Sequence, residues 1–307
     1  ARYRRLAMYM QQFDLILTYN WGAMDAVAAR RLFPHGCPPL VHHEDGFNVD
    51  EAEGLNWKRN GFRRLMLPAA ARLVVPSQTL ERIARMTWHQ PADRLIRIGN
   101  GIDTEAYARP PEPGSIPGLT PNAADLVIGT LAGLRAVKNL PRLVRAVAPL
   151  GEHVRLVIVG EGPERDAIQR EAQQLGMGDR VLLPGFLGRP QSYLGHFDIF
   201  ALSSDSEQFP ISLIEAMAAG LPVAATDVGD VRTIVSEANR PFVVKPGNEA
   251  DLSGALRRLC GDPALRRTLG ESNRALARSA YDESSMIRAY AMLYEAEIRR
   301  PATLFPR

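Results

Sequence analysis

Residues 199–222 read IFALSSDSEQFPISLIEAMAAGLP. The apolar run at 199–203 has the length and continuity of a strand buried on both faces, and after a polar turn a helix is expected to begin near Pro210. The first N–H groups of a helix have no partners inside it and carry the positive end of the helix dipole. This segment therefore predicts a parallel sheet with an anion-binding site at its C-terminal edge.

The same alternation of short apolar runs and helix-length amphipathic stretches continues along the chain. It is typical of βα units, in which the strands of a parallel sheet are buried on both faces. The predicted strands lie at 13–18, 39–43, 72–76, 95–99, 126–131, 154–160, 181–185, 199–203, 222–226 and 242–244. Because 307 residues exceed the size at which one hydrophobic core usually stops growing, we expect two domains of the α/β class.

A Pro- and Gly-rich stretch at 109–120, RPPEPGSIPGLT, can continue neither a helix nor a central strand and is interpreted as the interdomain linker. The predicted domains are Rossmann-like and lie at 1–109 and 121–277, with a helix following at 284–299. The first supplies only about four strands, where a doubly wound domain has about five or more. The chain also opens in a helix-like stretch without Met, so we expect a truncated N-terminal domain.

Two carboxylates, Glu207 and Glu215, flank the predicted anion site. Carboxylates in such a place are suited to accept hydrogen bonds from sugar or ribose hydroxyls, and poorly suited to bind the phosphate itself. The spacing therefore indicates a ligand that carries both phosphate and hydroxyl groups.

A second motif follows the predicted strand at 126–131, where Gly133 precedes Arg135 and Lys138. Two cations in this place would reach the same edge of the sheet, where they can neutralise a diphosphate. Lysine occurs only at positions 58, 138 and 245, which makes the placement of Lys138 more informative.

These motifs together resemble those of the retaining glycosyltransferases with the GT-B fold, family 4, and the resemblance runs from residue 71 to residue 295. Further matches are the segments at 75–77, 100–103, 160–163 and 185–186. The resemblance implies two Rossmann-like domains facing a cleft. It also implies metal-independent transfer of a sugar, with retention, from a nucleoside diphosphate to an acceptor hydroxyl, and no cofactor beyond the donor substrate.

By this resemblance, Arg135 and Lys138 would hold the donor diphosphate, Glu207 the hydroxyls of the transferred sugar, and Glu215 the ribose. Six more positions would line the donor site: Gly133, Phe186, Phe209, Pro210, Ile211 and Ser212. The family often has Gly where this chain has Gln208 and Pro210, so the donor sugar stays open.

In the N-terminal domain, His43 and Asp45 follow a predicted strand where the family carries a His or Asp facing the transferred sugar. The resemblance implies a catalytic role for them, in orienting the sugar or the acceptor. It also implies that the helix at 284–299 returns to pack on the N-terminal domain.

The charge distribution bears on partners. Residues 1–109 carry 15 Lys and Arg against 11 Asp and Glu, which fits either a solvated helix surface or weak attraction to an anionic membrane face. No apolar run reaches the length of about 18 residues that a membrane span needs, and no nucleic-acid motif is present.

Cys37 and Cys260 lie far apart, so neither a disulfide framework nor a Cys-based metal site is expected. We expect a cytoplasmic protein that can associate peripherally with the inner face of the membrane. Its expected acceptor is a saccharide or a lipid-linked saccharide.

Rival interpretations have weaker support. The segment 160–165, GEGPER, begins like a dinucleotide fingerprint but lacks the third Gly and the acidic ribose partner after the next strand. No D-x-D triplet or H-x3-H pairing indicates a metal. Two alternatives stay open: a sugar-nucleotide epimerase or hydrolase on the same scaffold, and a catalytically silent nucleotide-sugar-binding module.

Overall fold

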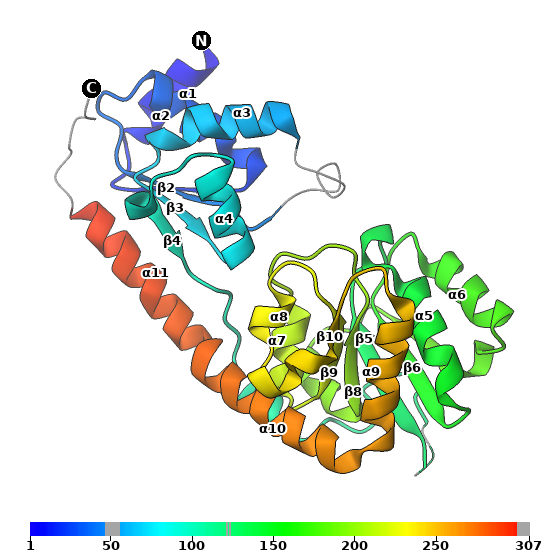
Figure 1. Cartoon of the computed structure of the whole chain (residues 1–307). Helices are drawn as coiled ribbons and strands as arrows, with labels where there is room; N and C mark the ends of the chain where they lie inside the picture. The colour runs from blue at the N-terminus through cyan, green and yellow to red at the C-terminus, as the bar shows by residue number, and fades with distance from the viewer. Residues whose placement is uncertain (47–55, 121, 123, 300–307) are drawn as a thin grey trace. The chain divides into compact units, whose positions relative to one another are not determined.

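The computed structural model describes residues 1–46, 56–120, 122 and 124–299. These residues form two compact units (Figure 1). Unit 1 comprises residues 1–100 and the C-terminal segment from Ser284, and unit 2 comprises residues 101–283. Each unit has its own parallel sheet, so the predicted class of two parallel-sheet α/β domains is confirmed.

Unit 1 contains a four-stranded parallel sheet in the order β1-β2-β3-β4. The strands are β1 (Ile16–Tyr19), β2 (Leu40–His43), β3 (Arg72–Val75) and β4 (Leu95–Arg97). The helices are α1 (Arg2–Met10), α2 (Met24–Leu32), α3 (Trp57–Met66), α4 (Gln78–Met86) and α11 (Glu283–Ile298). All four strands fall in or next to predicted runs, because a strand buried on both faces needs continuous apolar sequence.

Successive residues of the strands of unit 1 point to opposite faces of the sheet. Leu40 and Leu73 belong to a cluster on one face, and their neighbours Val41 and Val74 belong to a second cluster that includes Leu293 of α11. Side chains in a strand alternate with a period of two, which gives each face its own apolar layer. The C-terminal helix thus covers one face of this sheet, as the resemblance implies.

Unit 2 contains a six-stranded parallel sheet in the order β10-β9-β8-β5-β6-β7. The strands are β5 (Leu126–Leu131), β6 (Val154–Val159), β7 (Val181–Gly185), β8 (Ile199–Leu202), β9 (Val223–Thr226) and β10 (Val243–Val244). The helices are α5 (Leu140–Val147), α6 (Arg165–Gln174), α7 (Ile211–Ala218), α8 (Val231–Ile234), α9 (Glu249–Gly261) and α10 (Pro263–Ala280). The order reverses between β5 and β8, which is the place where doubly wound sheets bind ligands.

Helices cover both faces of this sheet. Residues of α7 and α10 pack with Val127 and Val157, whereas residues of α5, α6 and α9 pack with Ile128 and Leu156. Gly129 in β5 lies against the ring of Phe197, and a Cβ at this position would come within 2.0 Å of that ring. The close fit of ring and strand explains a glycine in the middle of a buried strand.

The predicted linker at 109–120 is part of unit 2. The Glu112 N–H donates to the Ser192 carbonyl at 2.7 Å, and Ile116 is buried in the core. The units divide instead after residue 100 and before residue 284. High Pro and Gly content correctly indicates irregular backbone here, but irregular backbone can still pack on a domain, so the sequence misplaced the linker.

Within the part of the chain that the structure describes, no helix combines the length and the apolar content needed to cross a membrane.

Candidate active site

The loops that follow β5, β6 and β8 lie at the C-terminal edge of the sheet of unit 2, two of them at the point where the strand order reverses. Lys138 comes from the first loop and Glu207 from the last. The Lys138 Nζ lies 2.5 Å from Glu207 Oε1, and the same oxygen accepts a hydrogen bond of 2.7 Å from Ser204. The structure thus brings together one predicted cation and one predicted carboxylate, in an ion pair that is mostly shielded from water.

Four further hydrogen bonds tie these two loops together. Asp205 accepts hydrogen bonds from Arg142 at 2.6 Å and from the Asn139 side chain at 2.9 Å. The Ser203 hydroxyl donates to the carbonyls of Lys138 and Asn139, each at 3.0 Å. Asn139 has a φ of 44°, a left-handed conformation in which Asn is better tolerated than most residues. Sequence reasoning missed these residues, because their partners lie more than 60 positions away.

The glycines of the loop after β6 make room for the loop after β5. Gly160 and Gly162 have φ values of 144° and 154°. A Cβ at these positions would lie 1.9 Å from the Ala132 carbonyl oxygen and 2.5 Å from that of Leu134. This segment, which begins like a dinucleotide fingerprint, therefore supports the neighbouring loop that carries Gly133.

Another glycine supports the loop of Glu207. Gly229 has a φ of 56°, and a Cβ there would lie 2.2 Å from the Glu207 carbonyl oxygen. The Asp230 N–H donates to the Gln208 carbonyl at 3.2 Å. The side-chain oxygen of Gln208 is buried and has no hydrogen-bond partner among the described residues. The sequence alone does not indicate this role of Gly229, because Glu207 is remote from it in the chain and only the fold brings the two together.

Helix α7 begins at Ile211, with Pro210 as its N-cap residue, so the predicted start of this helix is confirmed. No side chain caps the helix. The N–H groups of Ile211 and Ser212 stand in the first turn, where a helix provides no acceptor for them. The ring of Phe209 packs edge-on against Tyr281, with 5.9 Å between ring centroids. The turn therefore presents two amides, while Phe209 anchors it to the core of unit 2.

Glu215 lies one turn further along α7, where its carboxylate is partly buried. The Tyr107 hydroxyl donates a hydrogen bond of 2.7 Å to Glu215 Oε1. Burial raises the pKa of Glu215 above its ordinary value, and the hydrogen bond from Tyr107 opposes this shift. Tyr107 was not predicted as a site residue.

The other predicted donor residues are open to solvent. Gly133 and Arg135 are exposed, and Phe186 is exposed by 77%. Among the described residues, no hydrogen bond or ion pair engages the Arg135 guanidinium. Arg135 is therefore available to an anion, whereas Lys138 is already paired with Glu207.

The histidine predicted in unit 1 is buried, with only 1% of its surface exposed. Its Nδ1 lies 3.1 Å from the Thr18 carbonyl oxygen, which can only accept, so Nδ1 carries the proton. Its Nε2 lies 2.9 Å from the Tyr294 hydroxyl, and the Tyr19 ring stacks on the imidazole at 4.4 Å. Burial lowers the pKa of His43. Both ring nitrogens are thus engaged inside unit 1, which is a packing role that the sequence did not indicate.

Asp45, in contrast, is exposed. Its N–H donates to the Asn20 side-chain oxygen at 2.7 Å, and the Asn20 N–H donates to the His43 carbonyl at 2.7 Å. Asn20 has a φ of 54°, a strained conformation for a residue other than glycine. The ends of β1 and β2 are therefore joined by backbone geometry that holds Asp45 at the edge of the sheet.

A buried ion pair stabilises the loop that carries Asp45. Arg63 lies 3.2 Å from Glu44 through Nε and 3.3 Å through Nη2, and both side chains are essentially inaccessible to water. The guanidinium lies over the rings of Trp21 and Trp88, at 5.2 and 5.1 Å from their centroids. Glu44 stands between His43 and Asp45, so this pair fixes the position of both neighbours.

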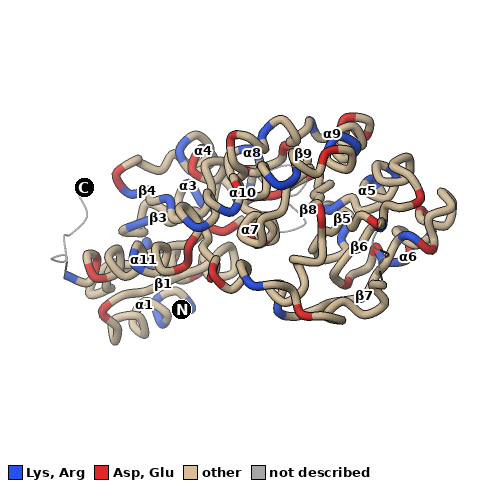
Figure 2. The backbone as a smooth tube through the Cα atoms, turned by 90° about the horizontal axis from the view of Figure 1, so that it is seen from below, with Lys and Arg blue, Asp and Glu red and all other residues tan. Residues whose placement is uncertain are grey.

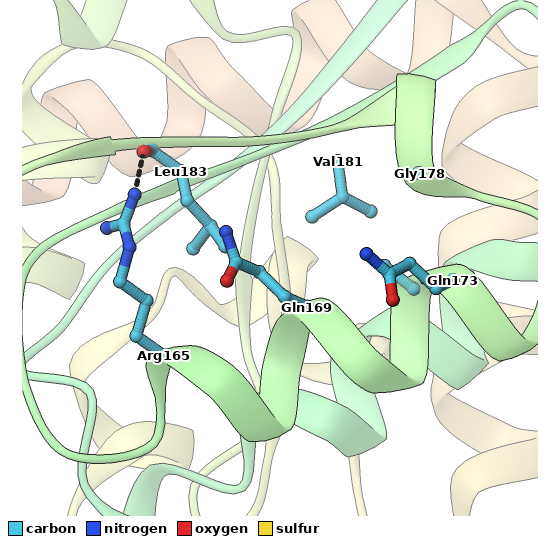
Figure 3. Close-up of a pocket in the computed structure, with 7 residues that line it drawn as sticks. Arg165, Gln169, Gln173, Gly178, Val181 and Leu183 are labelled. Carbon is cyan, nitrogen blue, oxygen red and sulfur yellow. Dashed lines mark hydrogen bonds between the residues drawn. The ribbon is translucent and has the colours of Figure 1, made fainter.

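A cavity of about 170 Å³ lies between α6 and the edge strand β7 (Figure 3). It is lined by Arg165, Gln169, Ala172, Gln173, Gly178, Val181 and Leu183. Arg165 donates to the Leu183 carbonyl at 2.8 Å across one end of it. None of the predicted donor residues lines this cavity, so it is separate from the candidate site. The described residues also contain no group of His, Cys, Asp and Glu arranged to hold a metal.

Comparisons with known proteins agree on the family. Residues 116–276 match the family Glycosyl transferases group 1, and residues 1–106 match Glycosyltransferase Family 4. The glycosyltransferase EpsD of Bacillus subtilis (strain 168) is 27% identical over 312 residues, which cover 95% of this chain and 81% of EpsD. The lipopolysaccharide core biosynthesis glycosyltransferase LpsD of Rhizobium meliloti (strain 1021) is 29% identical over 194 residues, or 63% of this chain and 56% of LpsD. The chain thus spans little more than half of LpsD.

A solved structure confirms the fold. Anabaena Alr3699/HepE in complex with UDP superposes with a TM-score of 0.81 at 22% identity, covering 96% of this chain and 82% of that one. This likeness shows the two-domain GT-B fold. Since the first family match alone covers more than half of the sequence, the chain belongs to the glycosyl transferases group 1.

Proposed function

We propose that this protein transfers a sugar from a nucleoside-diphosphate sugar to a hydroxyl of a saccharide or lipid-linked saccharide, with retention, in polysaccharide or glycolipid synthesis. The observation that carries the proposal is the Lys138–Glu207 pair beside the uncapped start of α7. This arrangement combines a cation, a carboxylate and helix amides at the switch point of a parallel sheet. HepE, of similar fold, has been solved with UDP and with UDP-glucose, and LpsD is named for lipopolysaccharide core synthesis.

We assign the donor diphosphate to Arg135, Lys138 and the amides of Ile211 and Ser212. Pro210 has no N–H to offer and instead sets the start of the helix. Glu207 Oε1 is already engaged by Lys138 and Ser204, so Oε2 is the atom assigned to hydroxyls of the transferred sugar. The ribose is assigned to Glu215. Gly133, Phe186 and Phe209 border this site as supporting positions.

Catalysis in this proposal consists of orientation and charge stabilisation. The bond from the anomeric carbon to the diphosphate oxygen breaks, and the acceptor oxygen forms the new bond to that carbon. The acceptor proton passes to the departing phosphate, which is itself the base. Arg135, Lys138 and the helix amides stabilise the negative charge that develops on the diphosphate, in positions that they hold before the reaction.

The acceptor is assigned to the C-terminal ends of the strands in the sheet of unit 1. Asp45 is the residue proposed to contact the sugar or the acceptor, because its carboxylate is exposed at the end of β2. His43 is proposed to act through it and through the stacked Tyr19, since both of its nitrogens are occupied.

A donor screen tests this function. UDP, GDP and ADP sugars are compared for thermal stabilisation of the protein and for diphosphate release, with and without a lipid-linked saccharide. We expect one nucleotide to stabilise the protein and its diphosphate to be released only when acceptor is present. Asp45→Asn should keep the stabilisation but lose acceptor-dependent release.

Other outcomes identify the other functions. Donor consumption without acceptor would indicate an epimerase or hydrolase, and donor binding without turnover would indicate a silent binding module. Failure of all three nucleotides to stabilise the protein would refute the donor assignment.

We also propose peripheral contact with an anionic membrane at the cytoplasmic face. On α1 the exposed arginines Arg4 and Arg5 each precede an exposed apolar residue by one turn, Met8 and Tyr9, and Phe13 follows (Figure 2 marks the basic positions near the N-terminus). Each basic residue near anionic headgroups gains about 1 kcal/mol, and the apolar side chains can enter the interface.

Vesicle flotation tests this contact. The protein should float with vesicles containing phosphatidylglycerol and not with neutral vesicles, and Arg4→Glu with Arg5→Glu should abolish flotation. The matched control reverses two exposed arginines of unit 2, Arg257 and Arg267, and should float as the wild type does. Equal flotation of both double variants would contradict the assignment to α1.

A further inference from the structure

Tyr107 reaches the candidate donor site from a segment that is remote in sequence. Ile102 donates to the Tyr281 carbonyl at 2.9 Å, and its own carbonyl accepts from Glu283 at 3.0 Å. A Cβ on Gly101 would lie 2.8 Å from the Glu283 Cα, so these two backbone segments are in close contact. The short 3-10 helix Ala106–Ala108 follows this pairing and places Tyr107 against α7.

Tyr107 and a second tyrosine, Tyr193, differ in their relation to the Glu215 carboxylate. The Tyr107 hydroxyl donates to Glu215 Oε1 at 2.7 Å. Burial raises the pKa of Tyr193, and the charge of Glu215 adds to this shift, but the Tyr193 hydroxyl donates to the Leu187 carbonyl at 3.4 Å. Both rings are buried in the same core cluster. The same core cluster therefore contains one tyrosine that donates to the Glu215 carboxylate and one whose hydroxyl donates elsewhere.

The hydrogen bond from Tyr107 restricts a side chain that would otherwise rotate. A glutamate has three side-chain torsions, and ordering it costs conformational entropy at the moment of binding unless a fixed partner orders it beforehand. With Oε1 held by Tyr107, Oε2 is the oxygen left for a ligand hydroxyl. The hydrogen bond also opposes the rise of the Glu215 pKa caused by burial, which favours the ionised form that accepts hydrogen bonds.

We propose that Tyr107 is a positioning residue that orients Glu215 toward the ribose hydroxyls, and so makes the site select ribonucleotide over deoxyribonucleotide donors. This inference rests on the proposed function, in which Glu215 binds the ribose. A ribose hydroxyl meets a carboxylate already in place, whereas a deoxyribose covers the same carboxylate oxygen without offering it a donor.

The test compares nucleotide discrimination in four proteins. Calorimetric Kd values are measured for UDP, GDP and ADP and for their 2′-deoxy and 3′-deoxy forms, with the wild type, Tyr107→Phe, Tyr193→Phe and Glu215→Gln. The wild type should prefer one ribonucleotide over at least one of its deoxy forms by about tenfold or more. Tyr107→Phe should reduce this ratio to about threefold or less, and Tyr193→Phe should keep it.

Two further readouts separate positioning from packing. In steady-state transfer, Tyr107→Phe should raise the donor KM with kcat nearly unchanged, because the lost contact acts on binding. The acidic limb of the pH dependence of nucleotide affinity should move to higher pH in Tyr107→Phe, because Glu215 then protonates more readily, and should stay in place in Tyr193→Phe. Among the described residues, the titratable groups that interact electrostatically with Glu215 or with its partner Tyr107 are Tyr107, Tyr193 and Asp103.

The outcomes distinguish failure of the inference from failure of the proposed function. If Glu215→Gln loses discrimination and Tyr107→Phe keeps it with an unshifted pH profile, Tyr107 only packs and the inference is overturned. If neither the wild type nor any variant discriminates, Glu215 does not contact the ribose and the donor assignment itself is overturned. Thermal melting of Tyr107→Phe beside Tyr193→Phe measures any folding defect, and Glu215→Gln tests the same contact from the other partner.

Discussion

Lys138→Ala and Glu207→Gln should each lower kcat/KM for sugar transfer by about 10²- to 10³-fold, the size expected when one prearranged group that stabilises developing charge is removed. Lys138→Ala would remove the ammonium that contacts the departing diphosphate. Glu207→Gln would lose the charge that now holds the Lys138 ammonium in place. Steady-state kinetics with the donor identified by the nucleotide screen measures both effects.

Two further variants test this prediction: a substitution of another lysine, and the double variant of Lys138 and Glu207. Lys245 is exposed, and Lys245→Ala should transfer at the wild-type rate. Because Lys138 and Glu207 contact each other, the double variant should lose much less than the product of the two single losses. Rates like those of the wild type in both single variants would refute the site assignment, provided that thermal melting shows both proteins folded.

The second large effect concerns stability. Arg63→Met should lower the free energy of unfolding by about 3–5 kcal/mol, because the buried Glu44 carboxylate loses its guanidinium partner and keeps, among the described residues, only the His42 imidazole, 3.6 Å away. Chemical denaturation followed by tryptophan fluorescence is suitable, since the Arg63 guanidinium lies over the rings of both Trp21 and Trp88. Replacing both partners, with Arg63→Met and Glu44→Gln together, should recover part of the loss.

The neighbouring residue provides the matched control. Arg64 lies on the same helix, α3, but is exposed, and Arg64→Met should change the free energy of unfolding by less than about 0.5 kcal/mol. An Arg63→Met protein as stable as Arg64→Met would show that the buried pair contributes nothing to the loop that carries Asp45.

Local sequence predicted most of the architecture. Each strand of the two parallel sheets falls in or beside a predicted apolar run, because a strand buried on both faces needs continuous apolar residues whatever its neighbours are. The start of α7 at Pro210 and Ile211 followed in the same way from the polar turn before it. The two carboxylates and the two cations of the proposed donor site were also recognisable, since each lies in a loop after a strand or in the helix that follows one.

Tertiary structure decided what these groups contact. His43 is the last residue of β2, within the predicted strand, but Tyr294 lies 251 positions away in the chain and occupies its second nitrogen, and the imidazole is buried. Glu215 is held by Tyr107, which is 108 positions earlier in the chain. The linker predicted at 109–120 packs on unit 2 because apolar Ile116 finds a core there. The sequence by itself determined where strands end and which charges stand at their ends. The partners of those charges depend on burial and on contacts between remote segments, which local propensity does not encode.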